Sequence, residues 1–165
     1  MFSATIYLSP LGGMLLTAND VGLVGLRFAS AQERAVWAVD GADVAIAAAK
    51  RWLDCYFSGQ EPDFTPPLHV TGTEFCRSVW RLLLHIPYGQ TVTYGHLAAK
   101  IARQRGLKRM AAQAVGQAVG RNPLAIIIPC HRVLGVGGKL TGYAGGLDKK
   151  CRLLQLERAW PRPQA

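Results

Sequence analysis

The sequence predicts a protein of mixed helices and strands, α/β in the broad sense and α+β in the narrower one. It is expected to have two domains. Apolar and polar residues alternate in short runs over residues 3–28, which indicates strands. A helical period follows as far as Phe57, and residues 58–70 then form a polar stretch with three prolines and a glycine. Because such stretches are typical of domain boundaries, we expect a first domain at 1–70, including this linker, and a second at 71–165.

In the first domain, strands are expected at 3–8, 12–17 and 21–28, separated by turn-forming residues. The chain then becomes helical from Ala42 to Phe57. One face of this predicted helix is apolar and consists of Ile46, Ala49, Leu53, Tyr56 and Phe57. Such a stripe is most often core, and we assign it to the core.

The second domain begins with Thr71 and Glu74 at the spacing of a capping box, which predicts the start of a helix. Apolar residues follow at helical spacing at Phe75, Val79, Leu82, Leu83 and Ile86. Thr93 is then expected to cap a short helix over Tyr94–Ala102, and a second helix is expected over Met110–Arg121. Two short helices joined by a basic loop are compatible with a helix-turn-helix or winged-helix DNA-binding unit, although many helix pairs bind nothing.

The helix expected over Met110–Arg121 is made largely of small residues: Ala111, Ala112, Ala114, Gly116, Ala118 and Gly120. Glycine inside a helix costs up to about 1 kcal/mol relative to alanine. The presence of two glycines in a helix with so few large side chains therefore has to be explained. Close packing against a neighbouring helix is one reason, and a helix slim enough to enter a groove of DNA is the other. The sequence leaves both open.

Positive charge is concentrated in the second half. The chain has a net charge of +9, yet residues 1–70 carry four basic and seven acidic side chains, against fifteen basic and three acidic ones in 71–165. This asymmetry suggests that the second half binds a polyanion. The alternative is that the positive charges only keep the surface soluble and bind no partner. No apolar run approaches the roughly 20 residues that span a bilayer, and we find no signal peptide.

The four cysteines are widely spaced and form no CxxC pair, so neither a zinc site nor a dithiol is expected. We expect reduced thiols and a cytoplasmic protein. Cys55, Cys76 and Cys151 are expected to be buried core thiols.

Cys130 is the candidate nucleophile. It follows a short apolar segment, Ala125–Ile128, that is expected to be a buried strand. A thiol attacks as a thiolate and needs a base or a positive charge beside it, and His131 is a candidate base. Neighbours on a strand point to opposite faces, so a turn at Pro129 would be needed to bring both into one pocket.

The last helix supplies a carboxylate. Counting from Leu147, an inward stripe is expected at Cys151, Leu153, Leu154 and Glu157. A carboxylate among leucines needs a partner. That partner is either an imidazole, which would complete a Cys–His–Glu relay, or water or an arginine at the edge of the stripe. The glycines of 135–138 and 142–146 suit turns or pocket walls, and their spacing does not match a phosphate-binding loop.

The segment Ile126-Ile127-Ile128-Pro129-Cys130-His131-Arg132-Val133, with Asn122-Pro123 before it and Gly142-Tyr143-Ala144-Gly145-Gly146 after it, resembles the bacterial type of O6-alkylguanine-DNA alkyltransferase. The similarity covers essentially all of 71–165 and is most specific around Cys130. Ser9-Pro10-Leu11-Gly12 and the order of strands and helix make the first domain similar to the family's RNase H-like N-terminal domain. The second domain is then the winged-helix/helix-turn-helix-like catalytic domain.

The resemblance implies a suicide reaction. Cys130 would accept an alkyl group from O6 of guanine in DNA, with O4-alkylthymine as a further candidate substrate. His131 would deprotonate Cys130 through a bound water, and Glu157 would orient His131. Tyr94 would give a proton to the leaving purine, and Asn122 would organise the turn. No cofactor and no metal are expected, since the lesion is its own alkyl donor.

The resemblance also implies how the base is held and reached. The carbonyls of Cys130 and Val133 would read the guanine amino group, the Ala144 amide would face O6, and Tyr143 and Gly145 would line the pocket. The base must be flipped out of the duplex. The family's arginine that fills the resulting gap is replaced by Gln113, and Lys108 or Arg109 could compensate. DNA contacts are expected at Gln113, Lys108, Arg109, Ala114, Gly116, Arg121 and Arg132, made by a monomer.

Three other functions remain open. A DNA-binding module with an inert Cys130 would only flag lesions, although the family's non-catalytic relatives replace this cysteine. A cysteine hydrolase would use Cys130, His131 and Glu157, but the basic second half disfavours it. An alkylation-sensing regulator would need an output domain, for which 165 residues leave little room.

Overall fold

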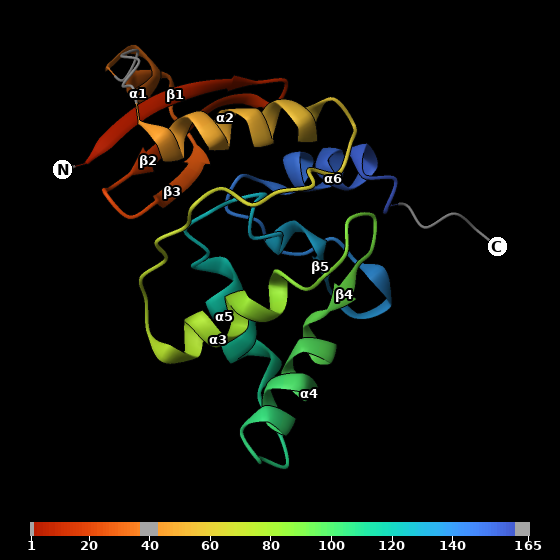
Figure 1. Cartoon of the computed structure of the whole chain (residues 1–165). Helices are drawn as coiled ribbons and strands as arrows, with labels where there is room; N and C mark the ends of the chain where they lie inside the picture. The colour runs from red at the N-terminus through yellow and green to blue at the C-terminus, as the bar shows by residue number, and fades with distance from the viewer. Residues whose placement is uncertain (1, 37–42, 161–165) are drawn as a thin grey trace. The chain divides into compact units, whose positions relative to one another are not determined.

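The structure is a computed structural model that describes residues 2–36 and 43–160 (Figure 1). Helices and strands are mixed, and the predicted α+β class is confirmed. The chain divides into two compact units. The first comprises Met1–Thr71 and Pro123–Ala125, and the second comprises Gly72–Asn122 and Ile126–Ala165. No helix in the described ranges is long and apolar enough to span a membrane.

The first unit contains a three-stranded antiparallel sheet in the order β1-β2-β3 (Figure 1). Its strands are β1 (Ser3–Ser9), β2 (Gly12–Ala18) and β3 (Leu23–Phe28), close to the predicted ranges. The third strand begins two residues later than predicted. The side chain of Asn19 explains this, because its Oδ1 accepts hydrogen bonds from the N–H groups of Val21 and Gly22 and holds them in a turn.

Two helices accompany the sheet. In α2 (Val44–Phe57), Asp43 caps the first turn, and the buried face is formed by Ala45, Ile46, Ala48, Ala49, Trp52, Leu53 and Tyr56. The predicted start at Ala42 lies outside the described residues. The short helix α1 (Ala31–Val36) was not predicted. It begins with a capping box in which Ser30 and Glu33 each accept a hydrogen bond from the other's backbone N–H.

The stretch predicted as a linker is partly built into the first unit. The backbone N–H of Leu23 donates to the carbonyl of Pro67, and the N–H of His69 donates to the carbonyl of Leu23, at 2.8 Å each. The side chain of His69 also hydrogen bonds to Asn19 at 2.7 Å. Residues 67–69 therefore pair with the start of β3 through an isolated bridge between Leu23 and Leu68.

The second unit is built on three helices, α3 (Glu74–Leu83), α4 (Tyr94–Gln104) and α5 (Ala112–Gly120). Their buried residues include Val79, Trp80, Leu83, Leu97, Ile101, Val115 and Val119. The predicted N-cap of α4 at Thr93 is confirmed, because its hydroxyl accepts from the N–H of His96. The predicted cap of α3 at Thr71 is wrong. Thr73 fills that position and accepts from the N–H of Cys76 at 3.1 Å.

The rest of the second unit holds two short parallel strands, β4 (Val92–Thr93) and β5 (Val133–Leu134), and the final helix α6 (Leu147–Leu156). The strand predicted at Ala125–Ile128 is absent. These residues form a turn in which Ile126 has a φ of 70°. The side chain of Asn122 closes the turn by donating to the carbonyl of Ile128 at 2.7 Å, so local hydrogen bonding overrides the strand preference of three isoleucines.

Candidate functional site

The last helix places a lysine and a glutamate on its buried face. Lys150, Leu153, Leu154 and Glu157 follow the i, i+3, i+4, i+7 spacing of a helical stripe, and all four are buried. The stripe predicted by counting from Leu147 started at the wrong residue. Leu147 is 46% exposed, and Cys151 is only half-buried. Glu157 keeps its predicted inward position, and Lys150 is the member that the prediction missed.

Glu157 joins two consecutive residues of a 3-10 turn, Cys130–Arg132. Nε2 of His131 hydrogen bonds to one carboxylate oxygen of Glu157, and Nε of Arg132 donates to the other oxygen at 2.7 Å. The side chains of His131 and Glu157 are fully buried. The two partners that the sequence offered as alternatives for Glu157, an imidazole and an arginine, are therefore both present.

Arg132 binds groups inside this cluster, and its guanidinium is therefore not available to contact DNA. Its Nη1 donates to the carbonyl of Ile86 at 2.7 Å, and its guanidinium lies 5.7 Å from the centre of the Tyr88 ring. The residue is 8% exposed. The expectation of a DNA contact at Arg132 is corrected on this ground: a guanidinium that binds a buried carboxylate and a buried carbonyl has little left to offer a phosphate.

The charge states of the cluster follow from its burial and its partners. Burial lowers the pKa of His131, against the opposing effect of Glu157, so the imidazole is neutral at neutral pH. Burial acts to raise the pKa of Glu157, but the hydrogen bonds from His131 and Arg132 and the positive charge of Arg132 lower it to about 2. The cluster thus holds an ionised carboxylate against a neutral imidazole, which is the state in which an imidazole can accept a proton.

Cys130 begins the same 3-10 turn and is half-buried. Burial raises the pKa of its thiol, while the hydrogen bond from Asn122 and the positive charge of Lys150 act in the opposite direction. The structure thus brings together three residues that the sequence singled out, Cys130, His131 and Glu157, with Asn122 at the turn beside them. A thiol in this setting is a candidate nucleophile.

Two tyrosines lie within electrostatic reach of Cys130. The hydroxyl of Tyr94, at the start of α4, donates to the carbonyl of Thr141 at 3.3 Å. The hydroxyl of Tyr143 is buried and has no hydrogen-bond partner in the described part of the chain. Burial, and then the charge of Cys130, raises the pKa of both phenols. Both therefore remain protonated at neutral pH and can act as donors.

Lys150 is a buried lysine that is held by carbonyl groups. Its Nζ donates to the carbonyls of Val133 at 2.6 Å, Thr141 at 2.8 Å and Gly142 at 3.1 Å. Burial lowers its pKa to about 8, against the opposing charge of Cys130. Its signal in the sequence was its spacing of seven residues before Glu157, which places both side chains on one face of the helix.

The loop over 139–146 carries the other predicted pocket residues. Ala144 is exposed and Gly145 is half-buried, while Val133 at the end of the Cys130 segment is fully buried. The carbonyl of Val133 accepts from Lys150, and that of Cys130 accepts from the N–H of Val133. Since a carbonyl oxygen has two lone pairs, each can accept a second hydrogen bond.

Both halves of the chain match one protein family. Residues 3–70 match the family domain described as "6-O-methylguanine DNA methyltransferase, ribonuclease-like domain". Residues 74–159 match the one described as "6-O-methylguanine DNA methyltransferase, DNA binding domain". The chain belongs to the 6-O-methylguanine DNA methyltransferase family. The predicted resemblance is confirmed, and with it the ribonuclease-like and DNA-binding character of the two parts.

Relatives of this family member align along nearly its whole length. It is 47% identical over 151 residues to the methylated-DNA–protein-cysteine methyltransferase of Methanosarcina barkeri, covering 90% of this chain and 92% of that protein. It is 45% identical over 153 residues to the protein of the same name from Mycolicibacterium paratuberculosis, covering 91% and 88%. Among solved structures, Mycobacterium tuberculosis OGT in complex with DNA matches with a TM-score of 0.80 and 41% identity, covering 95% and 93%.

Two glycines of the slim helix α5 in this methyltransferase family member are not required by packing within the protein, whereas Ala118 is buried and its carbonyl accepts from the Trp80 indole at 2.8 Å. A Cβ added at Gly116 would lie 3.7 Å from the Tyr94 ring, an ordinary contact, and one added at Gly120 would meet nothing within 4 Å. Of the residues predicted to contact DNA, Gln113, Lys108, Arg109 and Arg121 are exposed, while Ala114 and Gly116 are half-buried. Packing therefore accounts for Ala118 but not for Gly116 and Gly120.

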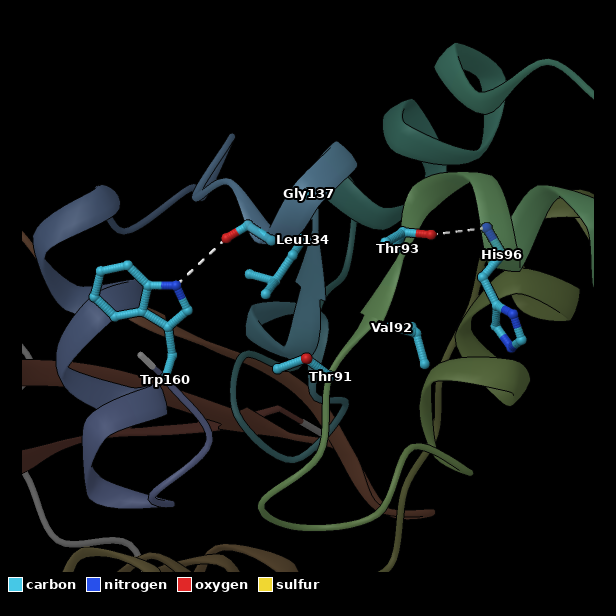
Figure 2. Close-up of a pocket in the computed structure, with 8 residues that line it drawn as sticks. Thr91, Val92, Thr93, His96, Leu134, Gly137 and Trp160 are labelled. Atoms are coloured by element: carbon cyan, nitrogen blue, oxygen red, sulfur yellow. Dashed lines mark hydrogen bonds between the residues drawn. The ribbon is translucent and has the colours of Figure 1, made fainter. Parts of the chain in front are cut away.

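A separate cavity of about 560 Å³ lies beside β4 and β5. Figure 2 shows Trp160, Leu134, Thr91 and His96 around it, with the indole N–H of Trp160 directed at the carbonyl of Gly138. None of the predicted catalytic residues lines this cavity. Within the described residues, no group of three or more His, Cys, Asp or Glu side chains is arranged to hold a metal ion.

The cysteines differ from the prediction in part. Cys76 is buried, as expected, but Cys55 and Cys151 are only half-buried. Neither residue is among the buried residues of its helix, α2 for Cys55 and α6 for Cys151. All four cysteines lie in the described ranges and are free.

Proposed function

We propose that this protein repairs DNA by direct reversal, moving the alkyl group of O6-alkylguanine onto Cys130 after the base has been flipped out of the duplex. The observation that carries the proposal is the position of Cys130 in one 3-10 turn with His131, whose imidazole hydrogen bonds to the ionised Glu157. Membership of the 6-O-methylguanine DNA methyltransferase family supports this chemistry and this substrate.

The reaction is a displacement at a saturated carbon. The Cys130 thiol gives its proton to His131 through a water molecule, and the thiolate attacks the alkyl carbon in line with O6. A C–S bond forms, the C–O6 bond breaks, and its electron pair leaves with the guanine. Tyr94 supplies the proton that makes guanine a neutral leaving group, a role that suits a phenol kept protonated by burial. The pair Glu157–Arg132 keeps the carboxylate ionised beside the imidazolium that forms.

The product is a thioether, which water does not cleave under ordinary conditions. One molecule therefore repairs one lesion, and the reaction needs no cofactor because the damaged base carries the alkyl group. Recognition of guanine is assigned to the second lone pairs of the Cys130 and Val133 carbonyls, which would accept from the exocyclic amine. The Ala144 amide faces O6, and Tyr143 and Gly145 line the pocket.

DNA binding is assigned to α5 and the basic loop before it. The small residues Ala114 and Gly116 allow the helix to enter the minor groove, and the exposed cations Lys108, Arg109 and Arg121 contact phosphates. Gln113, exposed in the first turn of α5, fills the space left by the flipped base. We propose that the protein binds DNA as a monomer and that it acts in the cytoplasm.

The test is the loss of the lesion from DNA. A duplex carrying one O6-methylguanine is mixed with the protein at known ratios, digested to nucleosides and analysed by chromatography. We expect one lesion lost per molecule with the wild type, none with Cys130→Ala, and an unchanged value with Cys151→Ala, a second half-buried cysteine. Repair by Cys130→Ala, or repeated turnover by the wild type, would overturn the proposal.

A further inference from the structure

Lys150 has an unusual set of partners for a buried lysine. The residue is completely buried, and its ammonium group donates to three carbonyl oxygens and lies 5.8 Å from the centre of the Tyr94 ring. No carboxylate in the described part of the chain bonds to it. Burying a cation without a counter-charge is costly, so the position calls for an anion that is present when the protein acts.

The charges around Lys150 identify that anion. The groups that face the site are Tyr94 from α4, Cys130, His131 and Arg132 from the 3-10 turn, Tyr143 from the loop over 139–146, and Glu157 after α6. Arg132 and Glu157 neutralise each other, and the two phenols and the imidazole are uncharged. Lys150 therefore gives the site a net charge of +1 while Cys130 is a thiol. Transfer of the thiol proton to His131 leaves that net charge unchanged, and Lys150 then supplies, together with the imidazolium, the positive charge that favours the thiolate.

Lys150 also joins the two segments that form the pocket. The carbonyl of Val133 lies three residues after Cys130, and the carbonyls of Thr141 and Gly142 precede Tyr143 directly in the chain. The Thr141 carbonyl accepts from Tyr94 as well. One ammonium group thus fixes the Cys130 segment, the Tyr143 segment and, through Thr141, the Tyr94 hydroxyl.

We infer that Lys150 is a positioning residue for alkyl transfer, whose ammonium group balances the charge of the Cys130 thiolate and holds the pocket segments on either side of it. The inference rests on the proposed function in taking the Cys130 thiolate as the attacking group. A residue with only a structural role would hold the segments without changing the ionisation of Cys130, and this difference makes the inference testable.

The first experiment measures the ionisation of Cys130 without DNA. The rate at which iodoacetamide modifies the Cys130 peptide is followed by mass spectrometry from pH 5 to 10, which separates Cys130 from the other three cysteines. We expect Lys150→Met to move the midpoint upward by about one pH unit, which corresponds to about tenfold slower modification below the midpoint. Lys149→Met, on the same helix, is the matched control and should keep the wild-type midpoint. An unchanged midpoint in folded Lys150→Met would overturn the inference.

The second experiment examines the same coupling from the other side and requires no lysine variant. The ε-methylene signal of Lys150 is titrated by NMR in protein labelled with ¹³C-lysine, in the wild type and in Cys130→Ala. Coupling between two sites is reciprocal, so removal of the thiolate should lower the titration midpoint of Lys150. Equal midpoints would contradict the inference even if Lys150→Met fails to fold. Because neither assay uses DNA, loss of repair with both shifts intact would count against the proposed function alone.

Discussion

His131 and Glu157 are 26 residues apart in the sequence, and their side chains form a fully buried hydrogen bond between Nε2 and a carboxylate oxygen. The next residue, Arg132, binds the other oxygen of the same carboxylate. Two consecutive side chains could not do this from a β-strand, where they would point to opposite faces. The 3-10 turn that contains Cys130 makes it possible, and it explains why one glutamate can orient an imidazole and remain ionised.

Arg132 is expected to contribute to stability and not to DNA affinity. Arg132→Met removes one partner of a buried carboxylate, which costs about 3 kcal/mol in the free energy of unfolding. Urea denaturation measures this loss, and fluorescence anisotropy on an undamaged duplex at matched salt should show unchanged affinity. The exposed Arg121 is the matched control: Arg121→Met should leave stability unchanged and weaken binding. A stable Arg132→Met protein with weaker binding would restore Arg132 as a DNA contact.

The stability of the protein should fall in acid, for two reasons of the same sign. The pKa of Glu157 in the folded protein is about 2, below its ordinary value of 4.5. Between these values the unfolded chain binds the proton and the folded chain does not, so the contribution of Glu157 is complete above pH 4.5 and is lost as the pH falls toward 2. The lowered pKa of His131 acts likewise below its ordinary value of 6.5.

The measurement for this acid effect is urea unfolding at pH 7, 5 and 3.5. The wild type should lose stability at each step, with the contribution of Glu157 amounting to about 3 kcal/mol in total over its window. Glu157→Gln is less stable at pH 7, but it should lose less than the wild type between pH 5 and 3.5. Parallel losses in the two proteins would show that Glu157 is not the group that titrates.

Gln113 should limit the affinity for DNA. It is exposed in the first turn of α5, where an arginine would add a positive charge close to the phosphates. Gln113→Arg is therefore expected to tighten binding to duplex DNA severalfold and to increase the slope of log affinity against log salt by up to about 1. Gln117→Arg, on a later turn of the same exposed face, separates the effect of position from that of charge. Unchanged or weaker affinity of Gln113→Arg at matched salt would contradict the proposal that Gln113 lies at the DNA and limits the affinity.

The thinness of α5 should matter for DNA binding more than for folding. Gly116→Ala removes a helix-interior glycine and fits beside Tyr94 without a clash, so it should stabilise the protein by up to about 1 kcal/mol. If α5 enters a groove of DNA, the added methyl group should weaken binding to an undamaged duplex. Thermal unfolding and anisotropy test the two effects together. A variant that is more stable and binds as well as the wild type would contradict the groove assignment.

Much of this architecture could be predicted because the local signals were strong. The alternation over 3–28 gave the strands of the sheet, and Thr93 has the spacing and chemistry of an N-cap. The cysteine–histidine pair and the glutamate among leucines were candidates for a reactive cluster, and the family resemblance joined them into one relay. The strands and the N-cap depend on residues that are close in sequence, so the sequence reveals them directly.

Three features were not revealed by the sequence, each for a different physical reason. One failure was local: the isoleucines before Cys130 have strand preference, but the side chain of Asn122, six residues before Ile128, closes them into a turn. The role of Arg132 was missed because an arginine beside a candidate active site of a basic protein is ordinarily assigned to phosphate. Only the fold shows that Ile86 and Glu157 bind it. Lys150 was missed because the helical stripe was counted from Leu147, and a buried lysine is rare enough to be left out of a core.

The most direct test of the account is mass spectrometry of the intact protein and its peptides after reaction with a duplex that bears one O6-methylguanine. We predict that one methyl group appears on the peptide containing Cys130, reaches one equivalent per molecule and then stops. The peptides containing Cys55, Cys76 and Cys151 should stay unmodified. A protein that binds this duplex but carries no methyl group on Cys130 would contradict the account and would make the chain a reader of lesions.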